Sequence, residues 1–412
     1  MPAATSIEIA RHVLLSGALI LAIGTIAALI AQRTKIPDVA MFPLVGILIG
    51  PQVLGFVDLK ADSTLNQVIL LFGASYILFD GGASLRFAVL KRVWITIVLL
   101  ATAGVVITGA ITAVAASAIL GVPLVTATLL GAAIASTDPA TLVPMFQQVH
   151  IRERIAQTVV SESALNDATS AIATFAVLGI ATGAQAFSLP AALLGLVQQA
   201  GIGIIAGIVF GYAAAWLIAH ERYGFLADYA PIVTLVAVIG AYFSADGLHS
   251  SGFTAVFVFG VMLGNQDAFG FAMPAGERRK LAEFAVTTAF ILRLFIFILL
   301  GTQVDFALVG KYLVGGILVV AVFMLVARPL TVFICAPLDR RARWQRAELL
   351  FMCWTRETGV IPAALAGLLL ALKVPGAEVI ASVTFIAILM TLLIQAPTTE
   401  WLARRLRLLR EG

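Results

Sequence analysis

The chain has 412 residues, of which 61% are hydrophobic and 12% are charged, and its formal net charge is +4 at pH 7. Soluble domains carry about 25% charged residues, so this composition excludes a soluble globular protein and predicts one embedded in membrane lipid. A net charge this small gives no reason to expect a nucleic-acid partner.

Apolar runs of about 20 residues, long enough to cross a bilayer, recur along the whole chain. They predict an all-α polytopic membrane protein with about 13 transmembrane helices, in which one bent helix over 226–266 is the alternative to two spans. The predicted spans cover roughly residues 10–31, 36–57, 64–85, 91–119, 123–147, 155–182, 190–219, 226–246, 249–266, 281–302, 308–337, 346–371 and 378–405.

Basic residues are distributed unevenly between the predicted loops. The loops after odd-numbered spans, with the C-terminal tail, hold 19 Lys and Arg residues, whereas the opposite loops hold Arg11, Lys60, Lys311 and Lys373. Because positively charged loops stay on the cytoplasmic side, we expect the N-terminus outside the plasma (inner) membrane and the C-terminus in the cytoplasm. The remaining basic residues fall within spans: Arg293, Arg328 and Arg356.

Two predicted spans are interrupted at their centres. Residues 136–144 read STDPATLVP, and residues 354–362 in the other half of the chain read WTRETGVIP. A proline removes a backbone donor and clashes with the preceding turn, so both spans should be broken or unwound. A matched pair of interrupted spans in the two halves predicts inverted repeats with a binding site at the midplane.

Acidic and amide side chains follow the first break, in the stretch 162–169 of the next span. An ionisable group at bilayer depth costs about 2.5–3.5 kcal/mol on insertion scales and usually marks an ion or proton path. Ser163, Asp167 and Ser170 share one helix face, and Glu162 and Asn166 form the adjacent stripe.

The predicted ligands of a monovalent cation are oxygen atoms, as a hard cation requires. Asp138, Asp167, Ser163 and the unwound carbonyl groups near Thr137 can supply them. Asn166 can donate hydrogen bonds that fix its neighbours without adding charge.

Buried charges need partners, and the sequence offers several. Glu162 is expected to pair with Arg356, and Arg293 is the second candidate. Asp80 has two readings of equal weight: an outer group that reaches the cavity, or an acid at the helix end paired with Arg86.

No cofactor or resident metal is expected. Cys335 and Cys353 lie in or near apolar spans without a His or Cys at a zinc-binding spacing. They are predicted to pack as small hydrophobic residues, without a disulfide.

These motifs resemble the monovalent cation:proton antiporters of the NhaP and NHE type, over nearly the whole chain from residues 46–51 (GILIGP) onward. The most specific elements are Thr137-Asp138-Pro139 and the stretch 162–167 (ESALND). The resemblance implies the NhaA/NhaP-like antiporter fold, with Asp167 binding cation and proton alternately. It also implies that Asp138, Ser163 and the backbone at Thr137 are further cation ligands.

The resemblance extends to charge pairing and stoichiometry. It implies that Glu162 and Arg356 form the buried acid–arginine pair. Asn166, where other members carry a second aspartate, implies electroneutral exchange of one ion for one proton. Two positions depart from the family pattern: Glu357 adds an acid beside the site, and Asp80 is one methylene shorter than the usual glutamate.

The family architecture is a homodimer in which a six-helix bundle moves against a dimerisation scaffold. By that likeness residues 1–90 form scaffold helices, and 91–182 form helices 4–6 of the transport bundle. Residues 190–302 form a linking helix and further scaffold helices, 308–405 complete the bundle, and 406–412 are a short cytoplasmic tail.

The predicted function is antiport of Na⁺, with Li⁺ and K⁺ as alternatives, against H⁺ by alternating access. Burial favours the protonated form of a carboxylate and a bound cation favours the ionised form, so the two substrates would compete. The alternatives are a channel, a sodium-coupled organic-anion transporter using Arg356 or Arg293, and an intramembrane aspartyl protease. The protein is not expected to be an enzyme.

Overall fold

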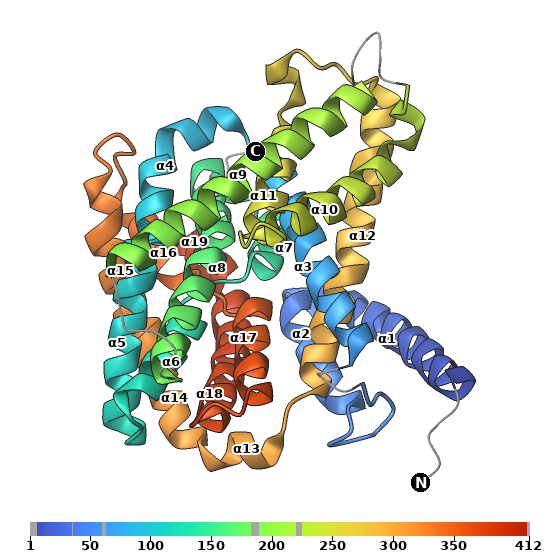
Figure 1. Ribbon diagram of the computed structural model, residues 1–412. Helices are drawn as coiled ribbons and strands as arrows, with labels where there is room; N and C mark the ends of the chain where they lie inside the picture. Colours follow the sequence, from blue (N-terminus) through green and yellow to red (C-terminus); the bar gives the residue numbers. More distant parts are fainter. Residues whose placement is uncertain (1–5, 35, 60–62, 183–188, 220–224, 410–412) are drawn as a thin grey trace.

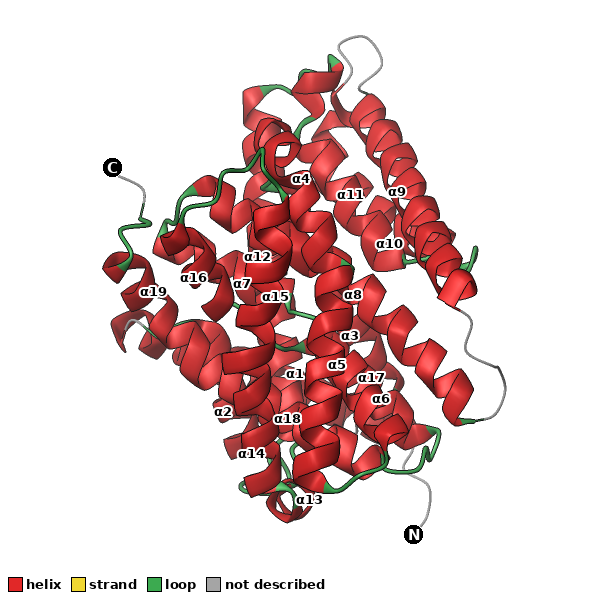
Figure 2. Cartoon of the chain, turned by 90° about the vertical axis from the view of Figure 1, so that its left-hand side faces the viewer, coloured by secondary structure: helices red, strands yellow, loops and turns green. Residues whose placement is uncertain are grey.

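The computed structural model describes residues 6–34, 36–59, 63–182, 189–219 and 225–409. Its regular structure within these ranges is helical, and one isolated bridge joins Ile151 to Leu409 (Figure 2). Four of the basic residues used to predict orientation lie outside the described ranges: Lys35, Lys60, Arg222 and Arg410.

Nine helical segments of the described chain are long and apolar enough to cross a membrane. Several of them are built from consecutive helices, with 3₁₀ or π turns labelled η. They are α1 (Ser6–Thr34), α3 (Thr64–Ala83), α4 with α5 (Phe87–Ala101, Ala103–Leu120), α8 (Glu153–Ala181), α9 (Leu189–Ala219), η1 with α10 (Ala227–Tyr229, Ala230–Asp246), α12 (Ala275–Thr302), α14 to η4 (Leu313–Val322, η3 Phe323–Ala327, α15 Arg328–Cys335, η4 Ala336–Leu338), and α18 to α19 (Ala377–Met390, η5 Thr391–Gln395, Ala396–Arg405).

Shorter helices account for the other four predicted spans. They are α2 (Asp38–Ile49), α11 (Gly252–Gly264), the pair α6 (Leu124–Ile134) and α7 (Pro139–Val149), and the pair α16 (Arg346–Trp354) and α17 (Val360–Ala371). The prediction of about 13 spans is therefore confirmed. Between spans lie η2 (Gln266–Phe269) and α13 (Phe306–Lys311). The stretch 226–266 forms two helices, α10 and α11, because Gly247 to Ser251 interrupt it.

Both predicted interruptions are present. Helices α6 and α7 are separated by 135–138, and α16 and α17 by 355–359. Pro139 is the first residue of α7, where its fixed φ suits a helix start and its missing N–H removes no hydrogen bond. The polar backbone freed at each break needs partners inside the protein.

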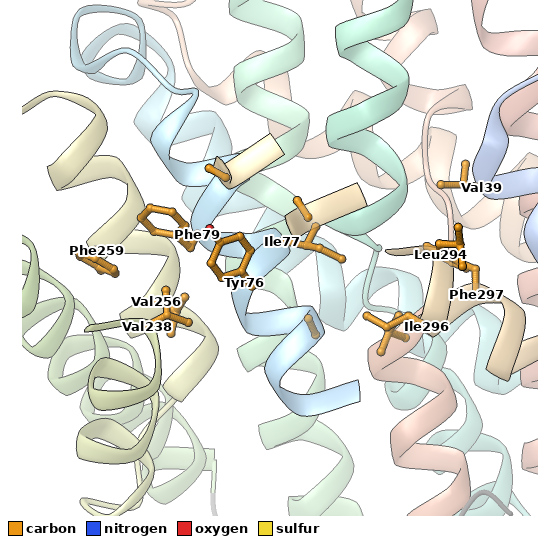
Figure 3. Close-up of a cluster of buried hydrophobic side chains, with 14 of the residues drawn as sticks. Val39, Tyr76, Ile77, Phe79, Val238, Val256, Phe259, Leu294, Ile296 and Phe297 are labelled. Carbon is orange, nitrogen blue, oxygen red and sulfur yellow. The ribbon is translucent and has the colours of Figure 1, made fainter. Parts of the chain in front are cut away.

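The hydrophobic core is divided among separate clusters. One joins mainly α1–α3 with α9–α12, and Figure 3 shows its aromatic centre, where the Phe79 and Phe259 rings stack at 5.0 Å. Two other clusters belong mainly to α4–α8 and α14–α19. Figure 1 shows the first group of helices around α1, α3 and α12 at the right, and the second around α5, α15 and α18 at the left.

Close backbone contact joins the helices of the first group. A Cβ on Gly46 of α2 would lie 2.9 Å from the Cα of Gly301 in α12. A Cβ on Gly260 of α11 would lie 3.0 Å from the amide nitrogen of Ala83 in α3. Small residues let membrane helices approach this closely, so these helices form a tightly packed unit.

Cys335 and Cys353 are buried and unbonded. Both lie in the cluster that includes Val332 and Phe351. They pack as small hydrophobic residues, as the sequence predicts.

Candidate cation site

The two broken helices cross at their breaks. The backbone N–H of Asp138 donates a hydrogen bond to the carbonyl oxygen of Glu357 at 2.8 Å. The Arg356 side chain in turn donates through Nη2 to the carbonyl oxygen of Ala135. Each break therefore satisfies part of the other's free backbone, which an unwound segment inside a membrane requires.

Helix α8 holds the first break in place. The backbone N–H of Thr137 donates to Asn166 Oδ1 at 3.1 Å, and Asn166 Nδ2 donates to Thr137 Oγ1 at 2.7 Å. The Ser136 hydroxyl donates to Asp167 Oδ1. The neutral amide of Asn166 thus holds the unwound segment in position, and the neighbouring carboxylate of Asp167 points toward the same segment.

The remaining polar face of α8 continues this contact. Ser170, one turn after Asn166, donates through Oγ to the carbonyl oxygen of Ala132 at 2.5 Å. The predicted face of α8 therefore lies against the end of α6 and the break that follows it.

The two predicted acids are almost fully buried, with Asp138 4% and Asp167 2% exposed. Asp138 Oδ2 accepts a hydrogen bond from Thr141 Oγ1 at 2.8 Å. Asp167 Oδ2 and Ser163 Oγ, both buried, make no hydrogen bond with the described part of the chain. A buried carboxylate oxygen and a hydroxyl without such partners are what an oxygen-seeking cation would use.

Glycine is required where the second break meets Asp138. A Cβ on Gly359 would lie 2.6 Å from the Cβ of Asp138, closer than real side chains approach. The backbone of the 355–359 segment therefore lies directly against the Asp138 side chain. Any larger residue at this position has to displace that carboxylate.

The partner predicted for Glu162 is wrong. Its carboxylate forms a bidentate ion pair with Arg328, which donates from Nη1 to Oε1 at 2.5 Å and from Nη2 to Oε2 at 2.9 Å. Arg328 Nε also donates to the carbonyl oxygen of Met352 at 2.9 Å. The Arg328 side chain of α15 thus joins Glu162 of α8 to the backbone of Met352 in α16, whereas the sequence marks Arg328 only as a basic residue inside a span.

Arg356 has a different environment from the one predicted. Its guanidinium lies over the ring of Phe323, 5.1 Å from the centroid, and binds the carbonyl oxygen of Ala135. The side chain of Arg356, in the second break, therefore connects the second break to the first. It forms no ion pair with another described residue.

Arg293 is not the second partner of Glu162 either. It pairs with Asp38 of α2 through Nη2 at 2.8 Å. Both residues lie on helices of the first cluster, α12 and α2, which explains why Arg293 is out of reach of the crossing.

The predicted pairing of Asp80 with Arg86 is also wrong, because Arg86 pairs with Glu153 at 3.0 Å. Asp80 lines a cavity of about 270 Å³ between α3, α11 and α12, together with Gln266 and Arg278. That Asp80 also reaches the cation site, as a group outside the direct ligands, stays a prediction.

Glu357 is buried completely within the crossing. Its backbone carbonyl oxygen accepts the hydrogen bond from the Asp138 N–H. Both oxygens of its carboxylate, by contrast, make no hydrogen bond with the described residues. Apart from the Glu162–Arg328 pair, the described residues at the crossing include the buried carboxylates of Asp138, Asp167 and Glu357 and the buried guanidinium of Arg356.

A family model described as "Sodium/hydrogen exchanger, transmembrane" matches residues 18–405. The chain belongs to this family. It is 31% identical over 360 residues to Na(+)/H(+) antiporter 1 of Methanocaldococcus jannaschii, which covers 84% of this chain and 81% of that one. It is 28% identical to the low-affinity Na(+)/H(+) antiporter NhaS1 of Synechocystis, over 94% of this chain and 73% of that one.

Other relatives differ in the ion that their names give. The K(+)/H(+) antiporter NhaP of Alkalimonas amylolytica is 28% identical, over 95% of this chain and 66% of that one. Among solved structures, the sodium proton antiporter MjNhaP1 from Methanocaldococcus jannaschii superposes with a TM-score of 0.79. It is 27% identical and covers 96% of this chain and 99% of that one.

These matches confirm two predictions from the sequence, the antiporter fold and a cation/proton antiport function of the NhaP type. They give no support to the sodium-coupled organic-anion alternative. In a sodium/hydrogen exchanger, buried carboxylates that can hold either a cation or a proton are the groups that exchange requires.

Proposed function

We propose that this protein exchanges sodium for protons across a membrane, and that the two ions compete for Asp167 and Asp138. The observation that carries the proposal is Asp167 itself, a buried carboxylate with one oxygen free of hydrogen bonds to the described chain, beside two unwound helices. Potassium is the main ion to compare, because the named relatives include both sodium and potassium antiporters. Lithium is the further alternative that the sequence left open.

The proposed ligands come from two adjacent elements. Helix α8 supplies Asp167 Oδ2 and the Ser163 hydroxyl, and the break before α7 supplies Asp138 and the backbone at Thr137. Carboxylate, hydroxyl and carbonyl oxygens suit a hard monovalent cation. The hydrogen bonds of Asn166 to Thr137 would keep the backbone ligands in position.

Exchange follows from competition at this site. A bound cation stabilises the ionised carboxylate, and a proton neutralises it, so one group holds one or the other. The empty, ionised site would be too costly to carry between the two sides of the membrane. Only the loaded forms then move, which couples the two fluxes.

We further propose that the exchange is electroneutral. Asn166 stands where a second aspartate would add a further proton-binding group. Its amide makes two hydrogen bonds to Thr137, so it serves to position the break without carrying charge.

The moving unit is proposed to comprise α4–α8 and α13–α19, and the scaffold α1–α3 and α9–α12. Most residues of each large hydrophobic cluster come from one of the two units, and close glycine contacts join helices within the scaffold, which supports this division. Alternating access would arise from one unit moving against the other. The homodimer, the outer N-terminus and the cytoplasmic C-terminus belong to the same proposal.

The test is cation-induced proton movement in proteoliposomes that contain a pH dye. Sodium, lithium and potassium are added separately, with and without valinomycin to clamp the membrane potential. Asp167→Asn is measured beside the parent protein. Proton flux that requires the cation, vanishes in the variant and ignores the clamp supports electroneutral exchange, whereas folded protein without flux for any of the three ions contradicts it.

A further inference from the structure

The connection between η4 and α16 is held in a fixed shape against α4. Asp339, which is buried, accepts hydrogen bonds at Oδ2 from the backbone N–H of Thr96 at 3.1 Å and from its hydroxyl at 2.8 Å. Its other oxygen accepts from the backbone N–H groups of Arg341 and Ala342. Trp344 Nε1 also donates to Thr96 Oγ1, at 2.9 Å. Both ends of the connection are therefore anchored to one residue of α4.

This anchored connection carries exposed arginines that the chain leaves without a counter-charge. The side chains of Arg340, Arg341, Arg343 and Arg346 are exposed, and so is Arg92, one turn before Thr96 on the same face of α4. These five arginines are called the basic patch. None of them forms an ion pair with a residue that the structure describes. The nearest acids in the chain, Asp339 and Glu348, are buried and bonded to other groups.

A second basic cluster, at the start of α12, has a different electrostatic environment. Each of its three basic residues lies against an acid. The pairs are Arg278–Asp267, Arg279–Glu283 and Lys280–Glu277, at 2.8, 2.7 and 2.8 Å. Retention of basic loops on one side of the membrane accounts for the presence of both clusters, but it does not explain why only one has acidic partners. Unpaired like charges repel one another, so the basic patch suits an anion from outside the chain.

The backbone at the centre of the connection also points to a role for these side chains. Arg343 has a φ of 46°, in the left-handed region that glycine adopts readily and that arginine rarely adopts. Such a conformation persists only where the surrounding structure enforces it, and it is found most often at binding sites. An arginine here places a charge on the surface where a glycine would fit the backbone with less strain.

The basic patch lies where two apolar spans reach the membrane surface. The span Leu313–Leu338 ends two residues before Arg340. The span Phe87–Leu120 has 34 residues, more than the roughly 20 that cross a bilayer, so its first turns can extend to the surface. The hydrogen bonds of Asp339 to Thr96 bring the end of the first span to this part of the second.

Apolar side chains lie next to the basic patch. Leu338 and Trp94 are 65% and 51% exposed, respectively, at the end of η4 and in α4. Exposed tryptophan beside arginine is typical of the headgroup level of a membrane, where one surface contacts both phosphate and acyl chain. In Figure 1 the connection after α15 lies beside α4 at the left edge, on the opposite side of the molecule from α1 and α12.

We propose that the basic patch binds the phosphate of an anionic phospholipid, whose acyl chains lie along Leu338 and Trp94. Guanidinium groups bind phosphate oxygens through paired, charge-assisted hydrogen bonds. Since Arg92 belongs to α4 and the other four arginines to the segment that leads into α16, one headgroup contacts two elements of the proposed moving unit. The site is separate from the cation site, and the inference does not depend on which cation the protein exchanges.

The test is native mass spectrometry of the purified protein in detergent, titrated with phosphatidylglycerol or with phosphatidylcholine. The parent is expected to bind the anionic lipid more tightly than the zwitterionic one. The test variant combines Arg340→Gln, Arg341→Gln and Arg343→Gln. Its affinity for phosphatidylglycerol should fall about 100-fold, because each basic residue near an anionic lipid surface contributes about fivefold.

The matched control combines Arg278→Gln, Arg279→Gln and Lys280→Gln, which removes the same charge from the cluster that has acidic partners, and its affinity should change little. Equal losses in the two triple variants would show a response to net charge alone and overturn the inference. Equal affinity of the parent for the two lipids would overturn it as well. Displacement of the lipid by inorganic phosphate at a similar concentration would identify a free anion as the ligand instead.

A charge-conserving variant separates binding from folding. Arg340→Lys, Arg341→Lys and Arg343→Lys together keep three positive charges at the same positions, so most of the affinity for phosphatidylglycerol should remain. A loss as large as that of the glutamine variant would trace the effect to the shape of the connection and contradict binding through its charges.

Discussion

Arg328 and Glu162 form a bidentate ion pair in which both side chains are excluded from solvent, at 0% and 1% exposure. Neither residue is near the other in sequence, and each comes from a different helix, α15 and α8. Removing one member leaves the other charge buried without a counter-charge, which destabilises the folded state. Replacing both members with apolar side chains leaves no unpaired charge.

Arg328→Met is therefore expected to lower the free energy of unfolding by about 3–5 kcal/mol, and Glu162→Leu in the same chain should restore much of it. Thermal unfolding in detergent, followed by tryptophan fluorescence, measures both. A double-mutant cycle with Arg356→Gln in place of Arg328→Met should show far weaker coupling to Glu162. Equal coupling of the two arginines would contradict the pairing described above.

Gly359→Ala should disturb the cation site directly. The added methyl would lie 2.6 Å from the Asp138 Cβ, so the carboxylate or the broken segment has to move, at a cost of about 1–3 kcal/mol. Cation-dependent proton flux should fall strongly. Gly367→Ala in α17 is the matched control, since a Cβ there meets no atom within 4 Å. Equal flux in the two variants would argue against close contact at Gly359.

Asn166→Asp should change the coupling while keeping the local structure. An aspartate can still accept the hydrogen bond from the Thr137 N–H, and the Thr137 hydroxyl can rotate to donate to it. The extra buried charge has to be neutralised by a further proton. Proton flux is then expected to respond to the valinomycin clamp, which it ignores in the parent, and indifference to the clamp in both would count against this role of Asn166.

Two arginines that pair with acids of different burial should differ in their contribution to stability. Arg154 donates through Nε to Glu348 Oε1 at 2.7 Å and also binds Ala342, and the carboxylate is 1% exposed. Arg86 pairs with Glu153 while 70% of its side chain is exposed.

Arg154→Ala is expected to cost about 1.5–3 kcal/mol, since charge-assisted hydrogen bonds to a buried acid are lost. Arg86→Ala should cost about 0–1 kcal/mol, because exposed pairs contribute little. Parallel melting curves at low and high salt compare them. A larger loss for Arg86→Ala would refute the ranking.

The features that depend on local chain properties could be predicted from the sequence. Hydropathy determined the membrane class and the number of spans, because each apolar run has to cross the bilayer by itself. The two breaks were predictable because Pro139 and Pro362 each lack a backbone donor, and each lies in the first turn of the helix that follows a break. Asp138 and Asp167 stood out because acids are rare at this depth.

The charge pairs depended on tertiary structure. The sequence offered Glu162 three arginines within predicted spans, Arg293, Arg328 and Arg356. Arg328 is the partner because its side chain extends from α15 to Glu162 of α8 and to the Met352 carbonyl oxygen of α16. Arg293 forms its ion pair with Asp38, which belongs to the same group of helices. An ion pair depends on distances of a few ångströms between side chains of different helices, and the apolar pattern that positions each helix in the membrane does not encode these distances.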